Sequence, residues 1–167
     1  MKKLNTFTAL LCSAILSSSP LQADELKKAI RLYEDGMLVR SQALFDEAYK
    51  ETPSADALGW AVLTDVQMQT PGYVARMDDF LRKNPHSPIA PQIKYSYATN
   101  LFDSEQYEAA AEEFAKIDRK ELMNNQVDEL IFCQAYCDLE NNKINAATDK
   151  FLELTKRPVS DYSSPAQ

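Results

Sequence analysis

The sequence has very little glycine and histidine, with 3 glycines and a single histidine among 167 residues. So few glycines argue against glycine-rich loops that cradle phosphates and against β-structures with many tight turns. One histidine leaves little material for a metal site, and no cofactor is expected. A surplus of positive charge is also missing, because 25 acidic residues outnumber 18 basic ones and the net charge is −7. This balance argues against partners with a phosphate backbone, so no nucleic-acid binding is expected.

The N-terminal apolar stretch, Phe7–Leu16, is about 10 residues long, whereas a helix that spans a bilayer needs about 20. Lys2 and Lys3 precede this stretch, and small residues follow it up to Ala23. The layout predicts a secretory signal peptide over residues 1–23 that is cleaved after Ala23. The alternative is an N-terminal core helix, which the lysine pair and the Ser-Pro break disfavour.

Cys12 raises the question of a lipoprotein signal. Leu11 stands directly before Cys12, where the lipobox of lipoproteins has Gly or Ala, so the match is poor. We therefore expect export without a lipid anchor, to the periplasm or the cell envelope, and no transmembrane segment in the mature chain.

Two cysteines, Cys133 and Cys137, remain after removal of residues 1–23, and the net charge becomes −9. An oxidising compartment would permit a disulfide between them. Their spacing of four in a predicted helix, however, makes the Cβ vectors roughly parallel, which suits a disulfide dihedral poorly. Buried free thiols are the favoured prediction, and a bridge is the alternative.

From Asp24 onward, apolar residues recur with helical spacing, and no stretch shows the alternation of a strand. Residues that break helices separate segments of about 11 to 16 residues, near the usual length of a globular helix. The sequence therefore predicts an all-α chain of about eight short helices whose neighbours pack antiparallel. The breaks are expected at Gly36, Pro53, Pro71-Gly72, Pro85–Pro91, Asn124-Asn125, Asn141-Asn142 and Pro158.

One pattern occurs three times along the chain. It consists of a small residue, a phenylalanine four positions later and an apolar residue three positions after that. The copies are Ser41, Phe45 and Ala48; Ala110, Phe114 and Ile117; and Ala147, Phe151 and Leu154. Another alanine stands 12 positions before each copy: Ala29, Ala98 and Ala135. The copies are 69 and 37 residues apart, close to two units and one unit of about 34 residues, which indicates a helical repeat.

These residue types at this spacing resemble the tetratricopeptide repeat family. The resemblance implies a right-handed α-solenoid of about four antiparallel helix hairpins, with units 24–53, 54–86, 87–122 and 123–158. The third unit is similar to repeats of bacterial outer-membrane assembly lipoproteins and Tol-Pal coordinating proteins.

The end of the sequence, residues 159–167, echoes the entry to the third unit. We expect it to be the start of a further, truncated hairpin. The helix before it would then expose an apolar edge, through which the chain could self-associate.

The resemblance also implies a binding surface, because one face of each first helix lines the concave groove in this family. In the third and fourth units that face carries aromatic and acidic side chains, a composition expected of a protein-binding surface. The alternative is that the rings belong to the core. The candidate groove residues are Tyr95, Thr99, Phe102, Asp103, Phe132, Tyr136, Leu139 and Glu140, next to Gln92 and Glu129.

No catalytic set can be assembled from the sequence. His86 stands in a proline-rich loop without an orienting partner. Neighbouring carboxylates such as Asp78 and Asp79 diverge around a helix and do not converge as an acid and a base would. We therefore expect a non-catalytic scaffold that binds a protein or peptide; the alternative is a carbohydrate- or peptidoglycan-binding accessory module.

Overall fold

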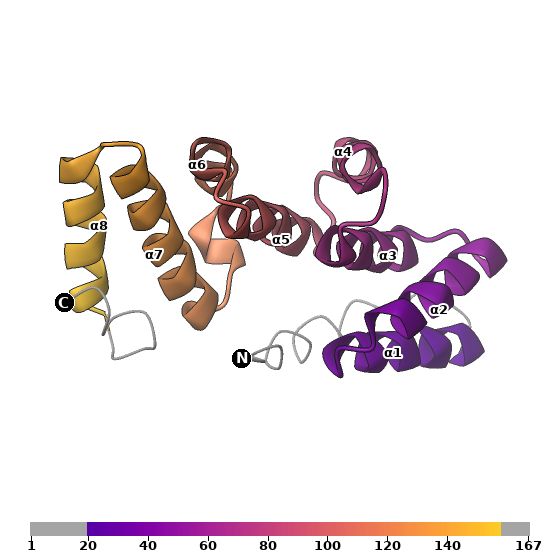
Figure 1. The fold of residues 1–167 in the computed structure, drawn as a ribbon. Helices are drawn as coiled ribbons and strands as arrows, with labels where there is room; N and C mark the ends of the chain where they lie inside the picture. The colour runs from indigo at the N-terminus through magenta and orange to yellow at the C-terminus, as the bar shows by residue number, and fades with distance from the viewer. Residues whose placement is uncertain (1–19, 158–167) are drawn as a thin grey trace. The chain divides into compact units, whose positions relative to one another are not determined.

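The computed structural model describes residues 20–157, which form helices joined by short connections (Figure 1). Eight α-helices and the short 3₁₀ helix η2 occur in this range, which contains no strand. The predicted all-α class and the expected eight helices are thereby confirmed. No helix between residues 20 and 157 has both the length and the apolar character needed to cross a membrane. Residues 1–19, most of the predicted signal peptide, and residues 158–167, with the predicted start of a further hairpin, lie outside the described range.

The described residues fall into two compact units, which divide between Ile93 and Lys94. The first contains α1 (Pro20–Glu34), α2 (Leu38–Glu51), α3 (Ala55–Met68), α4 (Tyr73–Lys83) and the start of α5 (Ala90–Asp103). The second contains the rest of α5, then α6 (Tyr107–Ala115), η2 (Arg119–Glu121), α7 (Asn124–Glu140) and α8 (Ile144–Thr155). Successive helices pack on one another, as α1, α2, α3 and α4 do in the first unit and α6, α7 and α8 in the second.

Several connections between helices pass through the left-handed region of the backbone. Gly36 and Gly72 have φ angles of 74° and 82°, which glycine adopts without a steric penalty. Both stand at predicted breaks. Glu105, with a φ of 60°, separates α5 from α6 in a stretch that contains neither glycine nor proline. Residues that break helices would therefore not reveal this turn, whereas the repeat spacing does.

The residues that recur along the sequence are the residues that the structure buries. All six recurring small residues are between 0% and 2% exposed: Ala29, Ser41, Ala98, Ala110, Ala135 and Ala147. Phe45 and Phe114 are fully buried, but Phe151 is only half-buried. Phe151 stands at the position that corresponds to Phe114 but is less buried, because α8 is the last described helix and no further described helix covers it.

The helix α3 carries the aromatic core of the first unit. The ring of Trp60 stacks on Phe45 with centroids 5.8 Å apart and meets Tyr33 edge-on at 5.3 Å. Next to it, Gly59 lies against Ile89 and Phe80. A Cβ atom on Gly59 would lie 2.4 Å from Cγ2 of Ile89 and 2.9 Å from Cζ of Phe80. Glycine therefore lets α3 approach these two side chains closely.

Replacing Gly59 with alanine is expected to destabilise the first unit by about 1–3 kcal/mol through overpacking. The same change at an unobstructed helical site would stabilise by about 1 kcal/mol, so the sign of the effect is the test. Urea unfolding followed by the fluorescence of Trp60, the only tryptophan, reports on this unit. A raised unfolding midpoint would show that the site has room for a methyl group.

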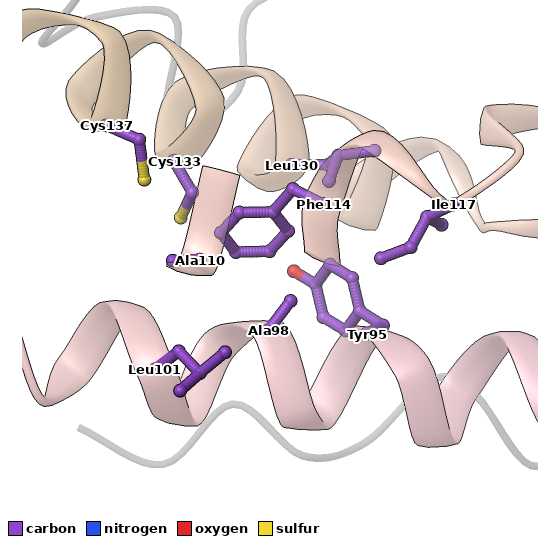
Figure 2. Close-up of a cluster of buried hydrophobic side chains, with 9 residues drawn as sticks. All are labelled: Tyr95, Ala98, Leu101, Ala110, Phe114, Ile117, Leu130, Cys133 and Cys137. Carbon is purple, nitrogen blue, oxygen red and sulfur yellow. The ribbon is translucent and has the colours of Figure 1, made fainter. Parts of the chain in front are cut away.

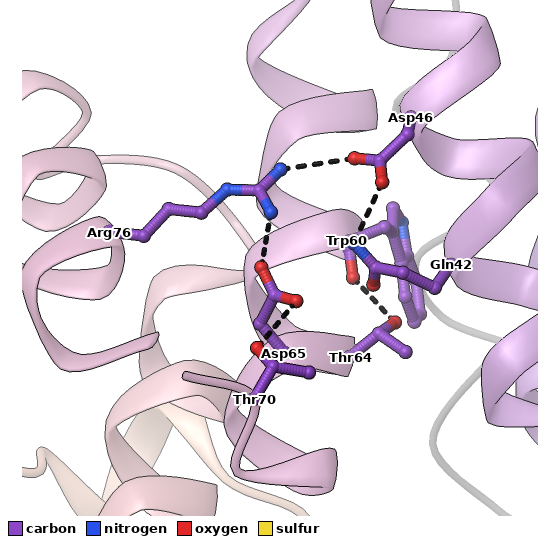
Figure 3. A network of polar contacts seen from close by, with 7 residues as sticks. All are labelled: Gln42, Asp46, Trp60, Thr64, Asp65, Thr70 and Arg76. Atoms are coloured by element: carbon purple, nitrogen blue, oxygen red, sulfur yellow. Dashed lines mark hydrogen bonds and ion pairs between the residues drawn. The ribbon is translucent and has the colours of Figure 1, made fainter. Parts of the chain in front are cut away.

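An ion-pair network joins α2, α3 and α4 in the first unit (Figure 3). Arg76 on α4 pairs through Nη2 with Oδ1 of Asp46 at 3.1 Å and through Nη1 with Oδ2 of Asp65. The side chain of Asp65 is only 7% exposed, and its Oδ1 accepts a hydrogen bond from the hydroxyl of Thr70 at 2.9 Å. Arg76 is thus the ion-pair partner of a buried carboxylate.

Candidate partner-binding surface

Phe114 lies at the centre of the core of the second unit (Figure 2). It projects from α6 between Ala98 on α5 and Leu130 on α7, and it is fully buried. Its ring centroid lies 6.5 Å from that of Tyr95 and 6.4 Å from that of Phe102. Phe114 therefore fixes the spacing of α5 and α7, the two helices that carry the candidate groove residues.

Half-buried aromatic side chains from α5, α6, α7 and α8 form a continuous row in the second unit. This aromatic row consists of Tyr107, Phe102, Tyr136, Phe132 and Phe151. The ring centroid of Phe102 lies 5.7 Å from that of Tyr107 and 5.6 Å from that of Tyr136. Phe132 continues the row, at 6.4 Å from Tyr136 and 6.0 Å from Phe151. Each such contact contributes about 0.5–1.5 kcal/mol, so the rings hold one another in place.

The structure brings three of the predicted groove aromatics, Phe102, Phe132 and Tyr136, into this row. Tyr95 is different: it is 7% exposed and belongs to the core around Phe114, so the prediction that it stands in an exposed groove is wrong. The reason is that its position on α5 faces α6. Thr99 is half-buried, and its hydroxyl donates a hydrogen bond to the backbone oxygen of Tyr95 at 2.9 Å.

Carboxylates accompany the aromatic row. Asp103 and Glu140 are exposed, and Glu129 is half-buried. Partial loss of contact with water raises the pKa of Asp103 above its usual range, and the negative charge of Glu129 raises this pKa further. Within the described residues these three carboxylates form no ion pair. The ion pairs of the second unit involve four other carboxylates: Glu113, Asp128, Asp138 and Glu153.

An open depression of about 530 Å³ lies at the Tyr107 end of the row. Burial raises the pKa of the Tyr107 hydroxyl; Tyr136 and then the carboxylates of Glu105 and Glu140 raise it further. The surroundings of this ring are therefore negative. The depression is lined by Glu105, Gln106, Tyr107, Glu108, Ala109, Glu112 and Asn141.

The expected apolar edge on α8 is smaller than the sequence predicts. Ala147 and Leu154 are 2% and 0% exposed, and Leu154 packs against Val127 and Ile131 of α7. Leu152 is 50% exposed. Self-association through this edge stays a prediction; it rests on Leu152, on the half-buried ring of Phe151 and on Ile144, which is 54% exposed on the same helix. Among the groove residues, Leu139 on α7 is 40% exposed and adds apolar surface.

Cys133 and Cys137 are free and buried, as predicted. Burial raises the pKa of both thiols, to about 11 for Cys137, and the charge of Glu129 raises that of Cys133 further. Both thiols are therefore protonated at neutral pH and are poor nucleophiles. In residues 20–157 no three His, Cys, Asp or Glu side chains come together as a metal site would require, and His86 is exposed.

Two members of the aromatic row, Tyr107 and Phe151, are absent from the predicted groove. Both stand on second helices of the predicted hairpins, whereas the prediction used first helices only. A signal was nevertheless present, because Tyr107 is a large aromatic side chain at the start of α6, where it can reach α5 and α7.

Neither a protein-family model, nor a curated protein, nor a solved structure matches the chain. The candidate surface is therefore defined by its own geometry. That geometry is a row of aromatic rings on four helices, accompanied by carboxylates that have no ion-pair partner among residues 20–157.

Proposed function

We propose that this chain is a non-catalytic scaffold that binds a segment of a partner protein along the aromatic row. Its helices would be stacked hairpins of the tetratricopeptide type, and the chain would be exported and act in the periplasm or at the cell envelope. The recurring small residues, all buried, support the repeat arrangement. The lysine pair and apolar stretch of residues 1–23 support export.

The observation that carries this proposal is the half-burial of all five rings in the row. Each ring packs against a neighbour in the row and keeps part of its surface open to water. A partner segment laid along the row would remove this remaining apolar surface from water, which is favourable by about 25 cal/mol per Å². Aromatic side chains are also the residues that most often dominate the binding energy of protein interfaces.

The proposal is tested by capturing partners from an envelope extract with the purified chain. Phe102→Ala, Phe132→Ala and Tyr136→Ala are each expected to weaken the capture of a specific protein by about tenfold or more, because hot-spot truncations cost about 2 kcal/mol. Tyr49→Ala is the matched control, since Tyr49 is a half-buried aromatic of α2 outside the row.

Circular dichroism of each variant separates lost binding from lost folding. Capture that depends on Tyr49 as much as on Phe132 would contradict the proposal. Recovery of glycan alone, without protein, would favour the alternative of a carbohydrate- or peptidoglycan-binding module, for which aromatic rings also serve.

A further inference from the structure

We propose that the segment bound along the aromatic row is basic and amphipathic. Its apolar side chains would lie on the row, and a lysine or arginine side chain would enter the depression beside Tyr107. This inference rests on the proposed function and adds the chemistry of the partner.

The apolar half of the inference follows from the continuity of the row. The rings of Tyr107 and Phe151 mark its two ends, and every ring between them touches the next. Leu139, 40% exposed on α7, adds aliphatic surface on the helix that carries Phe132 and Tyr136. A segment that follows such a row needs apolar side chains on one face only, as an amphipathic helix or strand provides.

The basic half of the inference follows from the charges around the row. Glu105, Glu108 and Glu112 line the depression, and within residues 20–157 none of them forms an ion pair. Asp103 on α5 and Glu129 on α7 stand on helices that carry rings of the row, and within residues 20–157 they likewise form no ion pair. Residues 94–157 contain 13 acidic and 8 basic side chains, and four of the basic ones are paired with other carboxylates: Lys116, Arg119, Lys150 and Arg157.

Tyr107 connects the two halves, because its ring is the end of the row and also a wall of the depression. A cation held against an aromatic face and next to carboxylates is attracted by both. A neutral apolar segment would cover the carboxylates without supplying a counter-charge, and desolvating an unpaired charge is costly. An acidic segment would be repelled. Of these three occupants, only the basic amphipathic segment can both cover the rings with apolar side chains and supply positive charge to the carboxylates.

Fluorescence anisotropy with three synthetic peptides tests this inference on the full chain. The first peptide is amphipathic, with Leu and Trp on one face and Lys on the other. In the second, Glu replaces every Lys, and in the third, Ser replaces every Leu and Trp. We expect the first peptide to bind more tightly than either of the others, and its affinity to fall as sodium chloride rises from about 0.05 M to about 0.5 M.

A variant without these charges tests whether the carboxylates around Tyr107 cause the preference for the lysine peptide. Replacing Glu105, Glu108 and Glu140 with Gln is expected to weaken binding of the lysine peptide about tenfold, because three neighbouring carboxylates are lost. The control carries the same change in net charge at exposed positions of α2 and α4, which carry no ring of the row: Glu47→Gln, Glu51→Gln and Asp78→Asn.

The outcomes separate the two proposals. Equal binding of the lysine and glutamate peptides, or equal weakening by the two triple variants, would overturn the inference about charge. Equal binding of the peptide without Leu and Trp would overturn the role of the rings. If no peptide binds while envelope partners are still captured in a manner that depends on Phe132, the basic segment is refuted and the scaffold function stands.

Discussion

Replacing Arg76 with methionine is expected to lower the free energy of unfolding of the first unit by about 3 kcal/mol, because the buried carboxylate of Asp65 loses its counter-charge. The hydroxyl of Thr70 would remain as a hydrogen-bond donor to Asp65, but it carries no charge. The side chain of Arg76 is itself 39% exposed, so water can reach the vacated place, and the loss stays at the low end of the range for a broken buried pair. The shift is measured by urea unfolding with Trp60 fluorescence.

Two further variants show that the buried charge causes the loss. Asp46 is 38% exposed, so Asp46→Asn removes a partly solvated ion pair and is expected to cost less than about 1 kcal/mol. Adding Asp65→Asn to Arg76→Met removes the unpaired charge and should recover part of the stability. No recovery in the double variant would mean that Arg76 acts through its packing.

Replacing Phe114 with alanine is expected to destabilise the second unit by about 4 kcal/mol, through lost burial and the cavity that remains between α5, α6 and α7. The ring is fully buried and contacts both Tyr95 and Phe102. The second unit has no tryptophan, so its opening is measured by hydrogen exchange of the backbone amides of α6 and α7.

Phe151→Ala is the matched comparison, because Phe151 stands at the corresponding position of the next copy of the repeat but is half-buried. Its loss is expected to cost about half as much, since less apolar surface returns to water. Equal losses for the two variants would show that residues outside the described range cover Phe151. A loss at Phe114 below about 2 kcal/mol would mean that the core collapses into the vacated space.

The local features of the fold could be read from the sequence. Helical spacing of apolar residues and glycine at Gly36 and Gly72 act over a few residues, and the structure places the helices accordingly. The recurring small residues also follow from the sequence, because close approach of two helices allows only small side chains where they cross. The free, unbridged state of Cys133 and Cys137 belongs to the same class, since a spacing of four within one helix disfavours a disulfide.

The sequence by itself therefore determined the all-helical class, the number of helices and most of the buried repeat positions, but not every helix boundary: the predicted break at Asn124-Asn125 forms the first turn of α7. Only the tertiary structure decided which rings lie at the surface, placing Tyr95 in the core and Tyr107 and Phe151 in the aromatic row. It also paired Arg76 with Asp46, 30 residues away in the chain. The physical reason is that helical periodicity specifies the face of a helix, whereas exposure and charge pairing depend on which other helix covers that face.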